Sequence, residues 1–195
     1  MFKHIFRKKS APPGHVTATL NARSQPLHRG EIYEDPLSEL LREYDLGEIN
    51  GGGTMQAVNG EVEYCDIEIE LKSLSEQNLA RIGKLLEQLG APKGSRLTVE
   101  SSGQQLPIGL NEGMAVYLNG TDLPDQVYAE CDSNVVYSEF DRLLEQAGRV
   151  HSYWQGPTET AFYMYGHSFA QMKTLLHDFM ASYPLCQRAR IEQIA

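Results

Sequence analysis

Residues 73–100, SLSEQNLARIGKLLEQLGAPKGSRLTVE, share their plan with residues 168–194, SFAQMKTLLHDFMASYPLCQRARIEQI. Each stretch begins with a serine and continues with apolar residues at helical spacing. Each is then interrupted by a proline and ends in a short alternating segment. Few residues are identical, but the order of helix, break and strand is the same. An internal repeat of this kind indicates a chain built from two similar structural units.

The sequence ahead of each stretch extends the match. In both units the pattern predicts a strand, a helix and then two strands that form a hairpin. These segments are 15–21, 35–47, 48–57 and 61–72 in the first unit, and 113–118, 135–146, 150–155 and 160–165 in the second. With the repeated helix and strand, each unit follows the βαββαβ order. The sequence therefore predicts an α+β protein of two tandem ferredoxin-like units, each with an antiparallel sheet and helices on one face.

Turn and charge patterns predict where the two units begin and end. Residues 1–13 form a basic N-terminal tail that contains four basic residues and no acidic one within its first ten positions. The first unit is expected at 14–100 and the second at 113–195. Between them, 101–112 is polar and contains Gly103, Pro107 and Gly109, which predicts a linker.

Composition limits the classes of function. The chain has 195 residues, 41% hydrophobic, and a net charge of −9. Acidity of this size favours a basic protein partner and argues against nucleic acid and anionic membranes. No apolar run approaches the roughly 20 residues that span a bilayer. Three widely spaced cysteines are typical of a reducing cytoplasm, so we expect a cytoplasmic protein of unknown oligomeric state.

The acidic residues are concentrated in one part of the chain. Residues 31–90 contain 14 acidic and 4 basic residues, a balance of −10. Asp66, Glu68 and Glu70 alternate with Ile67, Ile69 and Leu71, so they share the outer face of the second hairpin strand. The apolar phase changes upstream, which predicts a β-bulge near Cys65. Two interpretations stay open: a partner surface, or a solvated face whose charges prevent edge pairing. The candidate partner residues here are Glu48, Glu63, Asp66, Glu68 and Glu70.

Aromatic residues gather in the second hairpin. Tyr163 and Tyr165 share one face of their strand, and Tyr153 or Trp154 of the preceding strand is expected beside them. Exposed Tyr and Trp are enriched in protein-binding surfaces. Cross-strand packing is the alternative explanation. We therefore add Tyr153, Trp154, Tyr163 and Tyr165 to the candidate partner residues.

No catalytic or metal-binding pattern is present in the sequence. The glycine run 51–53 precedes a hairpin turn, expected at Asn59-Gly60 as type I′, rather than a helix, so it does not form a phosphate loop. These glycines more readily explain a bulge or the close approach of another element. The histidines and cysteines lack zinc spacing. We expect no catalytic residue, no metal, no cofactor and no enzymatic activity.

Three segments carry a resemblance to known proteins. LGEINGGGT at 46–54, LGAPKGS at 89–95 and FYMYG at 162–166 resemble segments of small bacterial tandem ferredoxin-like proteins, some of them immunity proteins of polymorphic toxin systems. The resemblance implies a bacterial protein that neutralises a secreted toxin by binding it, and it assigns no functional residue.

Two hypotheses of function follow. The first is an acidic protein-binding module that neutralises or sequesters a basic partner, such as a toxin. The alternative is a regulatory protein that senses a small molecule at the junction of the two units.

Overall fold

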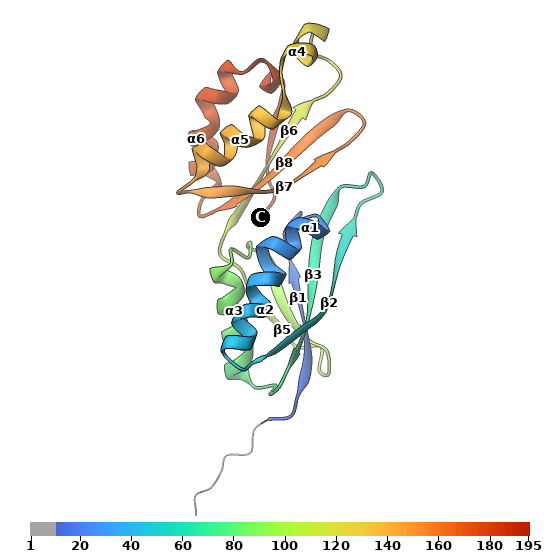
Figure 1. The fold of residues 1–195 in the computed structure, drawn as a ribbon, viewed down its shortest axis with the longest axis vertical. Coiled ribbons are helices and arrows are strands. Elements are labelled where there is room, and N and C mark those ends of the chain that lie inside the picture. Colours follow the sequence, from blue (N-terminus) through green and yellow to red (C-terminus); the bar gives the residue numbers. More distant parts are fainter. Residues whose placement is uncertain (1–10) are drawn as a thin grey trace, which may run out of the picture.

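The computed structural model describes residues 11–195, which form two helix-covered sheets (Figure 1). The first unit contains β1 (Gly14–Leu20), α1 (Pro26–Arg29), the π-helical turn η1 (Gly30–Glu34), α2 (Asp35–Glu43), β2 (Gly47–Gln56), β3 (Val62–Leu71), α3 (Glu76–Gln88), β4 (Ser95–Val99) and β5 (Gln105–Ile108). The second contains β6 (Glu112–Asn119), α4 (Asp125–Glu130), α5 (Ser133–Leu144), β7 (Gly148–Gln155), β8 (Glu159–Gly166), α6 (Phe169–Ser182), the 3₁₀ turn η2 (Pro184–Cys186) and β9 (Arg190–Gln193). Most of the proposed N-terminal tail, residues 1–10, lies outside the described residues.

The strand order confirms the predicted fold. The first sheet has the order β2-β3-β1-β4-β5 and the second β7-β8-β6-β9, and neighbouring strands are antiparallel. The common four-strand order is that of a ferredoxin-like unit, and β5 extends the first sheet by one strand. The protein is thus an α+β chain of two tandem ferredoxin-like units.

The repeated helices begin as the sequence predicts. Ser75 Oγ accepts the backbone N–H of Asn78 at 3.2 Å, and Ser168 Oγ accepts that of Gln171 at 3.4 Å. Each serine satisfies one backbone donor that the first turn of a helix leaves without an intrahelical partner. The equivalent caps show that the two units use the same local device to begin this helix.

Removing either cap should therefore destabilise the protein to a similar, moderate extent. We expect Ser75→Ala and Ser168→Ala each to lower the free energy of unfolding by roughly 1 kcal/mol, because the helix loses an N-cap acceptor. Ser75→Asp, which keeps an acceptor, serves as the control. Urea denaturation measures the effect, and an unchanged midpoint in both alanine variants would contradict these roles.

Each sheet packs against its helices through buried apolar side chains. In β3, Cys65, Ile67, Ile69 and Leu71 are buried toward the helices, while the intervening residues are exposed or partly exposed. The expected bulge is present upstream of Cys65: Met55 pairs with Tyr64 and Gln56 with Val62, which leaves Glu63 as the extra residue.

The structure corrects three local expectations. The first helical segment starts at Pro26 rather than at Asp35. The π-helical turn η1, which ends at Glu34, joins α1 to α2, and Pro36 lies near the start of α2. Gly60 has φ +82° but Asn59 is not left-handed, so the hairpin turn is not type I′. Residues 105–108, expected within the linker, form β5. Leu106 and Ile108 pack on the first core, and Pro107 is tolerated on an edge strand.

The core of the first unit continues into the second unit. Its cluster of buried residues includes Ala115, Tyr117, Ala161, Tyr163 and Tyr165, all on the sheet face of the second unit that is turned away from α5 and α6. The other face of that sheet forms a separate core with α5 and α6. The first unit therefore covers the outer face of the second sheet, whereas no helix within residues 11–195 lies on the outer face of the first sheet (Figure 1).

Candidate functional site: a groove at the free edge of the first sheet

A large cavity lies where α2 ends and β2 begins. Asp45 adopts a left-handed conformation, φ 52°, and Leu46 N–H donates to the carbonyl of Leu41 at 2.9 Å. Asp is one of the few non-glycine residues that tolerates this conformation. The turn reverses the chain, so the end of α2 and the start of β2 lie next to each other.

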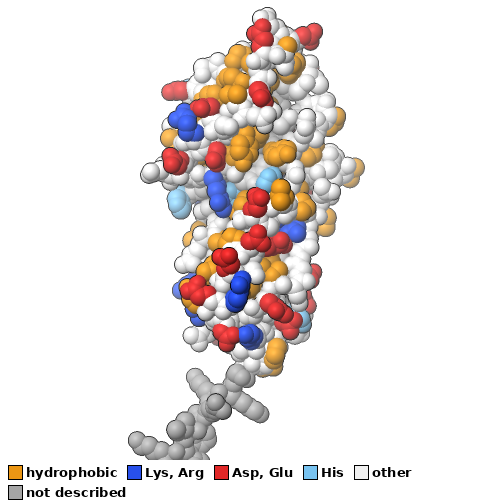
Figure 2. All heavy atoms as spheres, in the orientation of Figure 1, with side chains coloured by type: hydrophobic (Ala, Val, Ile, Leu, Met, Phe, Trp, Pro, Cys, Tyr) orange, Lys and Arg blue, Asp and Glu red, His pale blue; other side chains and the backbone are white. Residues whose placement is uncertain are grey.

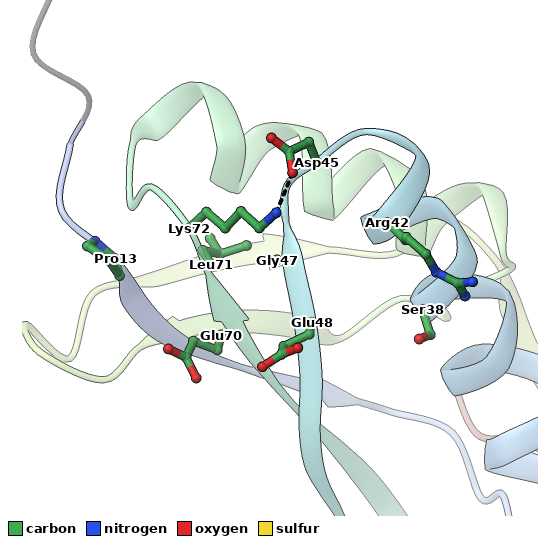
Figure 3. A pocket seen from close by; sticks show the side chains of 9 residues that line it. All are labelled: Pro13, Ser38, Arg42, Asp45, Gly47, Glu48, Glu70, Leu71 and Lys72. Carbon is green, nitrogen blue, oxygen red and sulfur yellow. Dashed lines mark hydrogen bonds and ion pairs between the residues drawn. The ribbon is translucent and has the colours of Figure 1, made fainter.

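This edge groove has a volume of about 560 Å³. Its walls come from α2, β2 and the end of β3, and they are formed by Pro13, Ser38, Arg42, Asp45, Gly47, Glu48, Glu70, Leu71 and Lys72. In Figure 3, Ser38 and Arg42 lie on one side of β2, while the carboxylates of Glu48 and Glu70 lie on the other. The lining residues of the groove therefore lie on both sides of the first residues of β2, which is an edge strand.

The groove carries charges of both signs. Glu48 and Glu70 are directly opposite each other in the β2–β3 register, so two carboxylates lie side by side. Lys72 pairs with Asp45 at one end (Figure 3). Arg42 makes no ion pair with any residue of the described chain. The site is consequently bipolar rather than uniformly acidic, and Figure 2 likewise shows acidic and basic side chains intermixed on the face it displays.

The remaining acidic candidates lie along the same sheet but outside the groove. Glu68 and Glu63 are exposed, whereas Asp66 is partly buried. Asp66 Oδ1 is buried without a hydrogen-bond partner among residues 11–195. Asp66 faces Gly53 across the β2–β3 ladder, and a Cβ built on Gly53 would meet nothing within 4 Å.

The structure corrects the expectation for the aromatic candidates. Tyr163 and Tyr165 share a face as predicted, but that face lies under the first unit, and their exposed fractions are 0% and 1%. Trp154 is partly buried against the same junction. Tyr153 points to the opposite side and keeps 43% of its surface exposed. Alternation revealed which residues share a face, but not that the other unit covers it.

A buried polar cluster, here called the junction latch, joins the two units. Glu61 Oε1 accepts hydrogen bonds from the hydroxyls of Tyr117 at 2.6 Å and Tyr163 at 2.8 Å, and it pairs with Arg23. The Tyr165 hydroxyl accepts the backbone N–H of Arg23 at 2.8 Å. Burial acts to raise the pKa of Glu61, but these hydrogen bonds and the Arg23 charge outweigh it and lower the pKa below its ordinary value. The latch therefore keeps Glu61 ionised.

A second polar chain crosses the junction through His151. Arg149 Nε donates to His151 Nε2 at 3.3 Å, and the Tyr33 hydroxyl lies 3.5 Å from both His151 Nδ1 and the carbonyl of Gly90. Arginine can only donate, so the imidazole proton is on Nδ1. Burial, followed by the charges of Arg149 and His28, lowers the pKa of His151 to about 3. His151 is thus a neutral structural residue of the junction.

Sequence patterns alone did not identify several of these residues. Ser38 and Arg42 lie on a helix that carried no motif, and Glu61 was grouped only with the acidic stretch. Spacing along one helix or strand cannot show which elements meet in space. No set of three or more His, Cys, Asp or Glu side chains in residues 11–195 is placed to hold a metal ion. The edge groove contains hydrogen-bonding and charged groups suited to binding.

Comparisons with known proteins describe the architecture and nothing finer. No protein-family model matches the chain, and no curated protein matches it. Among solved structures, the first two RRM domains of the yeast poly(U) binding protein Pub1 share 15% identity, with 92% of this chain and 99% of that chain covered and a TM-score of 0.24. The ligand-free regulatory subunit of aspartate kinase from Thermus thermophilus shares 12% identity, with 85% and 92% covered and a TM-score of 0.26. Both are similar to this chain in their tandem ferredoxin-like plan.

One expectation about partners was wrong. The acidic balance was taken to exclude nucleic acid, yet a chain of similar plan belongs to a poly(U) binding protein, so the exclusion does not hold. The comparisons also give no support to a basic protein partner, and the edge groove is bipolar. No helix in residues 11–195 has the length and apolar character needed to cross a membrane.

Proposed function

We propose that this protein is a non-catalytic binding module that takes up an extended peptide segment of a protein partner along β2. The observation that carries the proposal is the free edge of this strand. β2 pairs with β3 on one side, and within residues 11–195 no strand pairs with its other side. Its free backbone N–H and C=O groups offer a template for strand addition.

The composition of β2 supports this use. Natural edge strands are usually short, charged or interrupted by proline. β2 is ten residues long, contains no Lys or Pro, and each of its residues is exposed or partly exposed. By contrast, β5 has four residues including Pro107. On β7, the carbonyl of Tyr153 already accepts the Gln25 amide at 2.6 Å.

The edge groove would supply selectivity. Side chains of an added strand alternate between two faces. One set would point toward Glu48 and Glu70, and the other toward Ser38 and Arg42 (Figure 3). Gly53 has neither a left-handed backbone nor a close neighbour that would require glycine. The lack of a side chain at Gly53 would leave space for a side chain of the partner. The resemblance to immunity proteins is an independent reason to look for a protein partner.

Peptide selection followed by mapping tests the proposal. We expect heptapeptides selected from a display library on the full chain to shift the backbone amide resonances of β2 in ¹⁵N-labelled protein. Because strand pairing uses the amides of alternate residues, N-methylation of one alternating set should abolish binding, while methylation of the other set should not. Equal effects of both sets, or shifts confined to other elements, would contradict strand addition.

A second candidate function rests on a cavity at the junction. This cavity of about 360 Å³ is bounded by Glu31 and Leu89 of the first unit and Arg149 of the second. One cation, one anion and an apolar wall suit a small ligand with two opposite charges. A regulatory protein that senses such a molecule is therefore the alternative. Saturable stabilisation by a zwitterion that Arg149→Ala removes would favour it.

A further inference from the structure

A third cavity lies in the second unit, far from β2 in the sequence. Its volume is about 300 Å³, and it is formed by the first residues of α5 together with β7 and β8. Three aromatic side chains, Tyr137, Tyr153 and Phe162, line it with four small polar residues. It includes Tyr153, the one aromatic candidate that remains substantially exposed.

The aromatic side chains give this cavity an apolar floor and one open wall. Phe162 is buried, and Tyr137 meets it edge to face with ring centroids 6.1 Å apart. Tyr153 is steadied on one side by His28, whose ring centroid lies 5.8 Å away. The rest of the Tyr153 ring faces solvent, so it offers an apolar surface that a ligand can cover.

The polar side chains of the cavity are amides and hydroxyls. They belong to Ser133, Asn134, Gln155 and Thr160. Asn134 donates one amide hydrogen to Asp132 Oδ1 at 3.0 Å, which fixes the side chain and leaves its own oxygen free to accept. Within residues 11–195, no hydrogen bond engages the side chains of Ser133, Gln155 or Thr160. Such groups both donate and accept hydrogen bonds.

The lining of the cavity offers no charged partner to a ligand. None of the lining side chains carries a charge. Burial raises the pKa of Tyr137, and the negative charges of Asp141 and Glu31 raise it further, while the positive charge of Arg149 opposes them. A phosphate or carboxylate group would therefore find no cation among the lining side chains, and an ammonium group would find no anion, which favours a neutral ligand.

We propose that this cavity binds a neutral sugar unit. A sugar presents an apolar C–H face, which fits the open ring of Tyr153. It also carries several hydroxyls that both donate and accept hydrogen bonds, which fits four amide and hydroxyl side chains around one space. The volume falls within the range of small-molecule sites. A nucleobase can also stack on a single exposed ring such as that of Tyr153, so nucleosides are the competing class of ligand in the test.

Binding measurements on the full chain test this site. The probes are glucose, galactose, mannose and N-acetylglucosamine, with uridine and adenosine as the competing class, all studied by saturation-transfer NMR and calorimetry. We expect saturable binding of at least one sugar. Tyr153→Ala should weaken it about tenfold, the loss expected for a stacked aromatic contact. Thr160→Val, which removes one hydroxyl at nearly constant shape, should also weaken binding.

Tyr44→Ala is the matched control, because Tyr44 is 38% exposed on the other unit. Circular dichroism will show whether the variants are folded. If Tyr153→Ala fails to fold, Gln155→Ala, at an exposed position, replaces it. The proposal is overturned by binding of nucleosides but no sugar, by no saturable sugar binding, or by equal affinity of wild type and the folded cavity variants.

Discussion

Glu61→Ala should lower the free energy of unfolding by roughly 3 kcal/mol or more, because it leaves several partly buried donors without their acceptor. Tyr117 and Tyr163 would lose hydrogen bonds to a charged oxygen, and Arg23 would keep its charge without a counterion. The side chain of Glu61 is only 15% exposed, so water can replace it only in part. Chemical denaturation of the full chain measures the loss.

The contribution of Glu61 should depend on pH in a defined direction. Its pKa is lower in the folded protein than in the unfolded chain, so its stabilisation is complete above the unfolded value of about 4.3. That stabilisation is lost as the pH falls through the folded pKa. The difference between wild type and Glu61→Ala should therefore shrink in strongly acidic solution.

A surface ion pair provides the control for Glu61. Glu139 pairs with Arg142 one turn away on α5, where water competes for both charges. Glu139→Ala should change stability little and should alter the acid limb of the pH profile far less than Glu61→Ala, because solvent screens this exposed pair. If Glu61→Ala were no more destabilising than Glu139→Ala, the junction latch would not hold the two units together.

The fold could be predicted because its signals are local. Serines 75 and 168 begin the repeated helices through hydrogen bonds to residues three positions away. The alternation of residues 66–71 separates the inner and outer faces of one strand. Such periodicities depend on neighbours along the chain, and two copies of the same order identified the ferredoxin-like plan.

The candidate site was harder to predict because it depends on what lies over each face. Alternation placed Tyr163 and Tyr165 together, but an inward face can meet a helix, another unit or a partner, and its pattern is the same in each case. Residues 105–108 show the same limit. A four-residue strand with a proline has too little periodicity to be separated from a linker, and its pairing with β4 stabilises it. The edge groove likewise arises from α2 and β2 meeting in space.

We expect the connection between the units to be strongly destabilised by one added methyl group at Gly109. Gly109 has φ +99°, and a Cβ there would lie 1.8 Å from the carbonyl oxygen of Pro92. The neighbouring Leu110 N–H donates to the carbonyl of Ala91 at 3.0 Å, which holds the connection against the loop after α3. We expect Gly109→Ala to lower the free energy of unfolding by roughly 4 kcal/mol or more, since backbone strain and a backbone clash combine.

Gly103→Ala separates these two contributions to the effect of Gly109→Ala. Gly103 also has a left-handed backbone, φ +70°, but a Cβ there would meet nothing within 4 Å. It should therefore show the backbone strain alone, roughly 1–2 kcal/mol. Because Gly109 lies beside the loop that positions the second unit, Gly109→Ala should also shift the amide resonances of the latch residues Arg23 and Glu61, whereas Gly103→Ala should leave them in place. Equal losses of stability in the two variants would show that the close approach of Gly109 to Pro92 adds nothing to the backbone strain, and unchanged latch resonances in Gly109→Ala would show that Gly109 does not set the position of the second unit.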